Sequence, residues 1–378
     1  MKNVLITGGA GFIGSNLALK LSQKGYIVTV LDNLSQQIHG SDPQHTSPLY
    51  KNIKNKVNFI NGSVTIHNDL IKSLAGQDAV IHLAAETGTG QSMYEIAKYV
   101  DVNIGGTALL LDVLTNNKHT IKKIIVASSR AIYGEGKYYC EKDGAVYPRI
   151  RADEDMLQGF YECKCPLCSG ALRLLPTDEE SKIYPTSIYG ITKQNQEQMI
   201  LTIGKSLGIP AVAFRYQNVY GPGQSLSNPY TGILSIFSTQ IKNNNNISIF
   251  EDGKESRDFV YIDDVVNATI LGLEKEEANY ETFNVGAGEP IDVITVARLL
   301  TKYYNSKVSI NITGKYRLGD IRHNYADLGK IKRLLNFSPH INFHEGLKQF
   351  CKWVDTQTVQ EDNYVNSINE MKEKGLFK

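Results

Sequence analysis

A tyrosine and a lysine four residues apart carry the clearest chemistry in this chain of 378 residues. Tyr189 and Lys193 lie in the stretch "YPTSIYGITK". On a helix, a spacing of four residues places two side chains on the same face. A free phenol has a pKa of about 10 and is a poor base at neutral pH, but a neighbouring ammonium group favours the phenolate. The pair therefore predicts proton transfer at Tyr189.

Two serines end a predicted strand shortly before this helix. The stretch "KKIIVASS" (122–129) is apolar until Ser128 and Ser129, and "RAIYG" follows it. Polar side chains at the carboxyl end of a parallel strand face the edge at which ligands bind. We expect Ser129 to hydrogen-bond the oxygen from which Tyr189 removes a proton.

The N-terminal residues predict the element that must stand opposite this pair. The apolar stretch "NVLITG" (3–8) leads into a glycine turn and a helical stretch, "SNLALKLSQKG" (15–25). A second strand, "IVTVL" (27–31), ends in Asp32. Strand, glycine turn, helix, strand and terminal acid together are typical of a dinucleotide-binding unit.

Each residue type in this unit has a physical role. Gly8 allows the chain to turn, Gly11 allows backbone N–H groups to approach a pyrophosphate, and Gly14 allows helix and strand to pack closely. The Asp32 carboxylate should accept hydrogen bonds from the adenosine ribose and repel a 2′-phosphate, which favours NAD over NADP.

Strands and helices continue to alternate along the chain. This order predicts an α/β fold with a doubly wound parallel (Rossmann) sheet, whose site lies at the carboxyl ends of the strands. The predicted strands are 56–60, 78–85, 122–129 and 209–216, and the predicted helices are 67–76, 94–114 and 192–208.

The Tyr–Lys pair alone has an ordinary alternative, because a chain with 21 tyrosines contains such helical pairs by chance. Its position after a dinucleotide fingerprint and a serine-ending strand favours catalysis. Tyr189 would then remove a proton from a sugar hydroxyl while a hydride leaves the same carbon for NAD.

Several motifs together resemble the extended short-chain dehydrogenase/reductases, and more narrowly the NAD-dependent nucleotide-sugar epimerases and dehydratases. They include "TGGAGFIG", "HLAA", "VNIGGT", "ASSRAIYG", "YGITK", "RYQNVYGP", "RDFVYIDDVV" and "FNVGAGEP". The resemblance implies a smaller C-terminal α/β domain that binds the nucleotide diphosphate. We predict a Rossmann domain from 1–215 and 259–285 with an insert at about 137–182, a substrate domain from 216–258 and 286–350, and a polar tail at 355–378.

The resemblance also implies a set of ligand-binding residues. Two arginines would grip the diphosphate, because a guanidinium is a forked, permanently charged donor, although either could instead pair with Asp258 or Asp320. The predicted substrate contacts are Glu86, Thr87, Ser129, Asn218, Arg257 and Arg322, and Gln217 is a further sugar-facing position. The predicted NAD contacts are Gly8, Gly11, Phe12, Ile13, Gly14, Asp32, Asn33, Ala84, Ala85, Asn103, Tyr189 and Lys193.

The residues after Ser129 restrict the reaction. In the sugar 4,6-dehydratases an Asp-Glu pair follows this position as acid and base, whereas this chain has Arg130 and Ala131. The 3,5-epimerising relatives place a cysteine base near there, and the nearest cysteine here, Cys140, lies further along. The groups that remain are Ser129, Tyr189, Lys193 and NAD. They suffice for oxidation at one sugar carbon, rotation of the keto intermediate and return of the hydride to the other face. An enzyme that works in this way is a 4-epimerase, and it needs no external reductant.

Several substrates and one other class of function stay open. The stretch "AAETGTGQSMYE" (84–95) and the insert resemble the dTDP-L-rhamnose 4-epimerase branch, which would convert dTDP-L-rhamnose to dTDP-6-deoxy-L-talose. Alternatives are a UDP-hexose or UDP-uronate 4-epimerase and a nucleotide keto-sugar reductase. A NAD-sensing regulatory or scaffolding protein would have no need of the Ser–Tyr–Lys set.

Three of the five cysteines lie within "CKCPLC" (163–168). The odd total argues against a disulfide scaffold and for a reducing compartment, from which we expect a cytoplasmic protein. Cys165 and Cys168 have the spacing of a zinc knuckle, and Cys163 and Cys140 could complete a structural site; reduced thiols in a loop are the alternative. We expect this insert to lie beside the mouth of the active site.

The overall charge indicates which partners to expect. Lys and Arg number 40 and Asp and Glu 39, so no global charge attracts nucleic acid or an anionic membrane. The N-terminus lacks the pattern of a signal peptide. We expect the protein to bind a nucleotide-diphosphate sugar, with no nucleic-acid or membrane partner, and to form a homodimer.

Overall fold

A parallel sheet of seven strands forms the centre of the computed structural model, which describes residues 1–230 and 232–378. The strand order is β13-β9-β5-β4-β1-β2-β3, and each neighbouring pair is parallel. The strands are β1 (Asn3–Thr7), β2 (Ile27–Asp32), β3 (Asn58–Asn61), β4 (Ala79–His82), β5 (Lys123–Ser129), β9 (Ala211–Tyr216) and β13 (Thr282–Val285). The strand order reverses beside β1. This topology confirms the predicted α/β fold with a doubly wound parallel sheet.

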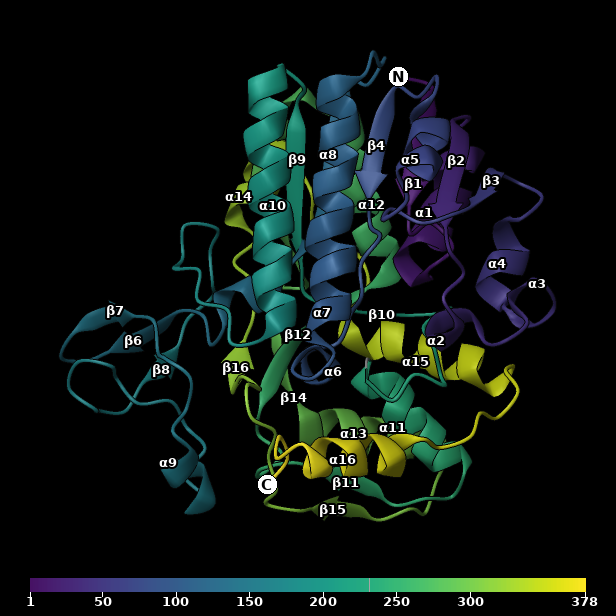
Figure 1. The fold of residues 1–378 in the computed structure, drawn as a ribbon. Helices are drawn as coiled ribbons and strands as arrows, with labels where there is room; N and C mark the ends of the chain where they lie inside the picture. Colours follow the sequence, from purple (N-terminus) through teal and green to yellow (C-terminus); the bar gives the residue numbers. More distant parts are fainter. Residues whose placement is uncertain (231) are drawn as a thin grey trace.

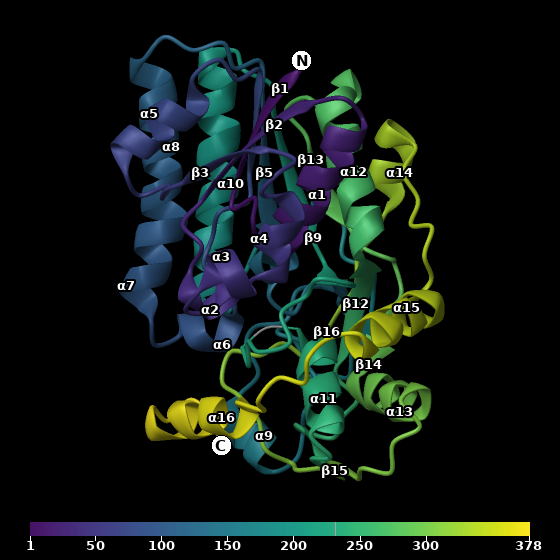
Figure 2. The ribbon, with the colours of Figure 1, turned by 90° about the vertical axis from the view of Figure 1, so that its right-hand side faces the viewer.

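Helices cover both faces of this sheet (Figures 1 and 2). Successive strand residues point to opposite faces, so Leu5 packs with one apolar cluster, whereas Val4 and Ile6 pack with the other. One face carries α5 (His67–Leu74), α8 (Gly106–Asn116) and α10 (Ile188–Leu207). The other carries α1 (Phe12–Gln23), α12 (Ile262–Glu274) and α14 (Gly329–Leu335).

The long helix predicted for residues 94–114 is divided in the structure. It consists of α7 (Ile96–Tyr99), the π-helical segment η1 (Val100–Gly105) and α8. Asn103, which is fully buried, lies within the π-helical segment. Such wide turns are rare and often occur at functional sites. Apolar periodicity alone does not reveal them, since the same residues fit an α-helix.

A smaller group of elements packs against the carboxyl end of the main sheet (Figure 1). Its core contains a group of aromatic side chains, where the rings of Tyr220, Phe259 and Phe343 lie within contact distance of one another. Its strands are β10 (Asn218–Tyr220), β11 (Ile247–Ile249), β12 (Ser256–Tyr261), β14 (Pro290–Asp292), β15 (Ile310–Ile312) and β16 (His323–Asn324). Its helices are α11 (Ile233–Lys242), α13 (Val293–Tyr303) and α15 (Phe343–Asp355). The exact two-domain division stays a prediction.

The C-terminal tail is folded onto this smaller group. Helix α16 (Tyr364–Glu373) buries Ile368 and Met371, and Phe377 is also buried. The chain end pairs with Tyr316, whose N–H donates to the Lys378 carbonyl at 2.9 Å. Apolar residues spaced along an otherwise polar tail thus give it one buried face.

The predicted insert forms a small unit that projects from the flank of the molecule (Figure 1). It contains β6 (Tyr138–Cys140), β7 (Gly144–Val146), α9 (Asp153–Leu157) and β8 (Arg173–Leu174), and the three strands form an antiparallel sheet in the order β7-β6-β8.

Short segments complete the described chain. They are α2 (Gln36–His39), α3 (Pro43–Thr46), α4 (Pro48–Ile53), α6 (Thr89–Ser92), η2 (Arg130–Tyr133) and η3 (Glu276–Ala278). Among the described residues, no helix combines the length and the apolar character needed to cross a bilayer.

Candidate active site

A cleft of about 450 Å³ opens at the carboxyl ends of the central strands and extends to β10 and β12. Most of the residues predicted for ligand binding line it. They are Gly8, Gly11, Phe12, Ile13, Gly14, Asp32, Asn33, Ala84, Ala85, Glu86, Thr87, Ser129, Tyr189, Gln217 and Asn218. Four predicted residues are not among the described lining residues: Asn103, Lys193, Arg257 and Arg322.

The glycine turn leaves room for a phosphate group at the start of α1. Gly8 has a φ of 67°, and a Cβ atom there would lie 2.7 Å from the Ala84 nitrogen. A Cβ atom at Gly14 would lie 2.4 Å from the Gly8 carbonyl oxygen. Gly11 caps α1 without a side chain, so the first N–H groups of the helix have no helical acceptor. This cradle suits a dinucleotide pyrophosphate.

Asp32 presents a fixed carboxylate to the same cleft. Its Oδ2 atom accepts a hydrogen bond from the Ala10 N–H and its Oδ1 atom from the Leu34 N–H, each at 2.9 Å. Burial raises the pKa of Asp32, and these N–H groups and His39 act in the opposite direction. An oriented carboxylate at the end of β2 is the acceptor that a ribose diol requires, so the site fits NAD.

Tyr189, Lys193 and Ser129 meet where α10 begins beside the end of β5. The Ser187 hydroxyl caps α10 by accepting the Gly190 N–H at 3.1 Å. The Lys193 Nζ atom donates to the Ala127 carbonyl at 2.9 Å, and burial lowers the pKa of Lys193 to about 7. Lys193 therefore lies behind Tyr189 rather than in the cleft wall.

Ser129 and Arg130 both lower the pKa of Tyr189. Burial raises the pKa of Tyr189, whereas a hydrogen bond with the Ser129 hydroxyl and the charge of Arg130 lower it. Ser129 Oγ also accepts the Ala131 N–H at 3.1 Å, which fixes its position at the strand end. The arrangement can hold a substrate hydroxyl and move its proton.

Asn103 acts from behind the cleft. Its Oδ1 atom accepts the Glu86 N–H at 2.7 Å, and its Nδ2 atom donates to the Glu86 carbonyl at 3.1 Å and to Thr192 Oγ1 at 2.9 Å. The side chain thus ties the loop after β4 to α10, one residue before Lys193. This geometry makes Asn103 a positioning residue, while its predicted contact with NAD stays a prediction.

Arg130 lines the cleft, and sequence reasoning assigned it no binding role. Its Nε atom donates to Asn218 Oδ1 at 2.9 Å. Burial and then the nearby charge of Arg257 lower the pKa of Arg130 to about 9. The available signal was its place directly after the serine that ends β5. Two neighbouring guanidinium groups favour an anion between them.

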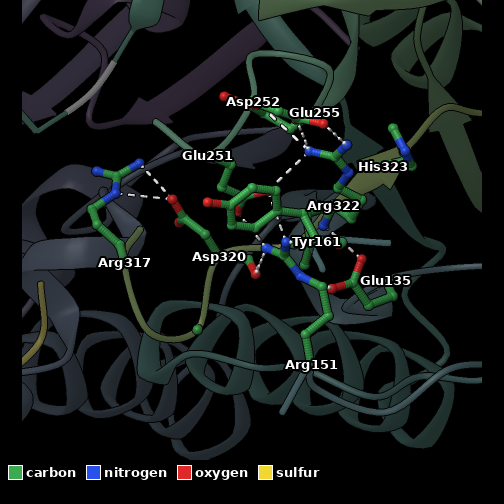
Figure 3. A network of polar contacts seen from close by, with 12 residues as sticks. Glu135, Arg151, Tyr161, Glu251, Asp252, Glu255, Arg317, Asp320, Arg322 and His323 are labelled. Atoms are coloured by element: carbon green, nitrogen blue, oxygen red, sulfur yellow. Dashed lines mark hydrogen bonds and ion pairs between the residues drawn. The ribbon is translucent and has the colours of Figure 1, made fainter. Parts of the chain in front are cut away.

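The other predicted arginines are held by protein groups. Arg257 donates to the carbonyls of Ser256, Ile321 and Arg322 at 2.7–2.9 Å. Arg322 is fully buried and pairs with Glu162 at 2.6 Å. It also pairs with Asp252 at 2.7 Å (Figure 3). Arg322 does not line the cleft in this arrangement, and its predicted contact with the diphosphate stays a prediction.

The alternative pairings of these two arginines do not occur either. Asp258 accepts backbone N–H groups of Ala287, Gly288 and Ala326, and Asp320 pairs with Arg317 at 2.8 Å.

The described residues of the insert (137–182) do not line the cleft, and its predicted place beside the mouth stays a prediction. The unit instead docks on the smaller group of elements through buried ion pairs, in which Arg151 pairs with Glu251 at 2.8 Å (Figure 3).

Comparison with known proteins decides the family. Residues 4–150 and 167–286 match the NAD dependent epimerase/dehydratase family. The chain belongs to this family. The interruption in the match falls within the insert, and the family resemblance read from the motifs is confirmed.

Three relatives of this family member cover nearly the whole chain. A dTDP-L-rhamnose 4-epimerase of Burkholderia thailandensis is 35% identical over 93% of this chain and 95% of its own length. The UDP-glucose 4-epimerase of Thermotoga maritima, solved with UDP-glucose, has 30% identity and a TM-score of 0.74, and the likeness covers 93% of this chain and 98% of that one. A Bacillus cereus UDP-glucuronic acid 4-epimerase, solved as a mutant with UDP-4-deoxy-4-fluoro-glucuronic acid and NAD, has 26% identity and a TM-score of 0.75. The likeness covers 93% of this chain and 99% of that one.

The family membership establishes the class of enzyme. The protein is a NAD-dependent nucleotide-sugar epimerase, which is an isomerase. The prediction of NAD as cofactor is thereby confirmed.

Proposed function

We propose that this enzyme inverts the configuration at C4 of a nucleotide-activated 6-deoxyhexose and converts dTDP-L-rhamnose to dTDP-6-deoxy-L-talose. The observation that carries the reaction type is the meeting of Ser129, Tyr189 and Lys193 at a cleft with a dinucleotide cradle. The identity with the Burkholderia enzyme supports the choice of sugar.

Tyr189 transfers the proton of the C4 hydroxyl, and Ser129 binds the oxygen of that hydroxyl. Tyr189 as phenolate accepts the proton of the C4 hydroxyl, and Ser129 donates a hydrogen bond to the same oxygen. When bound, NAD takes up a hydride from C4 and returns it to the opposite face after the sugar has turned. Tyr189 then returns the proton to the C4 oxygen, so no external reductant is consumed.

In this proposal the charge of Lys193 favours the phenolate form of Tyr189. Its Nζ atom is held by the Ala127 carbonyl on β5, beside the phenol ring. With a pKa of about 7, a large share of Lys193 carries a proton near neutral pH, and that charge favours the phenolate. Because Lys193 acts through Tyr189, its effect should appear in the pH dependence of turnover.

Arg130 and Asn218 bind the diphosphate in this proposal. Arg130 faces the cleft and is held in place by the Asn218 side chain. An anion between Arg130 and Arg257 would relieve the repulsion that contributes to the lowered pKa of Arg130. The same residue argues against dehydration, since Arg130 and Ala131 supply neither the acid nor the base of that reaction.

Glu86 favours an uncharged sugar over a uronate. It lines the cleft next to Thr87, and its carboxylate lies 3.5 Å from Lys98. A sugar carboxylate would add a second negative charge to this cleft. The UDP-glucose and UDP-glucuronic acid epimerases among the similar structures keep UDP-hexoses and UDP-uronates as alternatives.

A panel of nucleotide sugars tests the substrate. The purified enzyme would be incubated with dTDP-L-rhamnose, UDP-glucose and UDP-glucuronate, and the products read by NMR. We expect turnover of dTDP-L-rhamnose and little of UDP-glucuronate, and Glu86→Gln should raise the use of the uronate relative to Thr87→Ser. Preferred turnover of UDP-glucuronate by the unmodified enzyme would reject the 6-deoxyhexose.

We also infer a homodimer in a reducing compartment, the cytoplasm. All five cysteines are free thiols in this structure, as such a compartment requires. Light scattering on the purified protein tests the dimer, and a monomer at working concentration would refute it.

A further inference from the structure

Three cysteines and one aspartate converge at the tip of the insert. The Sγ atoms of Cys140 and Cys168 lie 3.5 Å apart. The Oδ2 atom of Asp143 lies 3.4 Å from the Sγ atom of Cys140 and 3.2 Å from that of Cys165. All four ligand atoms lie within 4.8 Å of one another. The Asp143 carboxylate thus takes the fourth position, for which the sequence analysis had predicted Cys163.

Cys163 faces a different environment, although it is close in sequence. It is buried, and its sulfur is not among the four ligand atoms that lie within 4.8 Å of one another. The ligand set therefore needs correction.

Two similar turns present the four ligands. The turn between β6 and β7 reads Cys140-Glu-Lys-Asp143-Gly144, and the second turn reads Cys165-Pro-Leu-Cys168-Ser169. In each turn the ligands are three positions apart, and the next residue is left-handed, with φ of 74° at Gly144 and 59° at Ser169. Paired turns of this spacing at the tip of small antiparallel strands are typical of ribbon-like zinc sites.

The second turn is tightly held by its own backbone. The Ser169 N–H donates to the Cys165 carbonyl, and the Cys165 N–H donates to the Gly170 carbonyl, each at 2.9 Å. A Cβ atom at Gly170 would lie 3.3 Å from the Cys168 Sγ atom, so glycine lets the backbone approach the sulfur closely. The backbone therefore places both sulfurs before any metal arrives.

The distances match a tetrahedral site. Zinc–sulfur bonds of about 2.3 Å and zinc–oxygen bonds of about 2.0–2.2 Å put ligand atoms roughly 3.5–3.8 Å apart. Three of the separations, at 3.2–3.5 Å, need only a small expansion, and all four ligand atoms lie within 4.8 Å of one another.

We propose that Cys140, Asp143, Cys165 and Cys168 bind one structural zinc(II) ion. Binding would release three thiol protons to solvent and leave three thiolates and one carboxylate around the ion. Four protein ligands leave no open coordination position, so the ion takes no part in the epimerase chemistry.

The zinc would anchor a segment that reaches the smaller group of elements. The chain between the two turns carries Arg151, which pairs with Glu251 (Figure 3). It also carries Glu162, which pairs with Arg322. The apolar core of the insert is small, consisting of Tyr138, Val146, Leu172, Leu174 and cysteines. A metal at its tip would supply the order that so small a core does not.

Metal analysis of the purified, reduced enzyme tests this proposal. We expect about one zinc per chain, with most of it lost in Cys165→Ser and Asp143→Ala. Asp143→Cys should keep the metal, because it restores a fourth ligand. Cys163→Ser and Cys351→Ser are matched controls that should keep it, since the Cys163 sulfur is not one of the four grouped ligand atoms and Cys351 lies in α15. The content of bound NAD would show that each variant is folded.

Replacement by Co²⁺ gives a second readout. Thiolate-to-cobalt charge-transfer absorption should appear in the parent and strengthen in Asp143→Cys. Three results would each overturn the site. The first is reduced enzyme that contains no zinc, and the second is a disulfide between Cys140 and Cys168 in place of the metal. The third is a loss of zinc from Cys163→Ser as complete as that from Cys165→Ser. None of these results depends on the identity of the sugar.

Discussion

The Nζ atom of Lys193 lies 6.0 Å from the centre of the Tyr189 ring, one helical turn further along α10. The hydrogen bond from Lys193 to the Ala127 carbonyl holds the ammonium group against the end of β5. The strand that positions Ser129 therefore also positions the charge behind Tyr189. Three groups from two elements are in this way held as one unit.

Replacing the Tyr189 hydroxyl should abolish most of the activity. Tyr189→Phe keeps the ring and removes the base, so kcat should fall by at least the ~10²-fold typical of general acid–base catalysis. Bound NAD, measured by absorbance after denaturation, should be retained. Tyr184→Phe, at an exposed tyrosine just before the helix, is the control and should leave kcat unchanged. Nearly full activity in Tyr189→Phe would exclude the phenolate mechanism.

Removal of the Ser129 hydroxyl should move the acid limb of the pH–rate profile. Tyr189 must lose its proton to act as a base, so activity falls as the pH drops below its pKa. Because the Ser129 hydroxyl lowers that pKa, Ser129→Ala should shift the limb of kcat/KM to higher pH. Ser128→Ala is a matched control at the neighbouring position. An unshifted limb would show that Ser129 does not act on the Tyr189 proton.

Asp32 should determine the preference for NAD. Asp32→Ala removes a charged hydrogen-bond acceptor, worth about 1.5–3 kcal/mol, so NAD affinity should fall by about tenfold or more. Affinity for NADP should rise relative to NAD, because a repelling charge is lost. Calorimetry on cofactor-free enzyme measures both, with Asp42→Ala, at an exposed aspartate, as control. Unchanged NAD affinity would refute the role given to the end of β2.

Arg130 should matter for the nucleotide sugar and not for NAD. Arg130→Met keeps much of the side-chain length and removes the donor to the diphosphate, so KM for the nucleotide sugar should rise by about tenfold or more. Affinity for NAD should stay close to that of the parent. Arg173→Met, in the insert strand β8, is the control. A KM in Arg130→Met equal to that of the control would remove Arg130 from the binding site.

Features that depend on neighbours in sequence were predictable. The sheet follows from alternating apolar strands, the cradle from the spacing of Gly8, Gly11 and Gly14, and the shared face of Tyr189 and Lys193 from the helical repeat. Each of these three patterns involves residues close together in sequence and has one structural interpretation.

Features that depend on contacts between distant segments were not predictable. The Arg322 guanidinium group is held by Glu162 and Asp252, which lie 160 and 70 residues away in sequence. The sequence alone therefore could not reveal that this group is already paired with carboxylates. Asp143 takes the ligand position expected for Cys163 because a hairpin turn, rather than residue type, decides which side chain faces the cluster. The π-helical turn at Asn103 leaves the apolar pattern of its helix unchanged.

The fate of the hydrogen at C4 tests the central claim most directly. dTDP-L-rhamnose labelled with deuterium at C4 would be incubated with the enzyme in ordinary water without added reductant, and the product followed by NMR. We predict that the C4 epimer forms and keeps its deuterium, because the hydride returns to the same sugar. Loss of the label to solvent, or product that forms only with added NADH, would contradict the account.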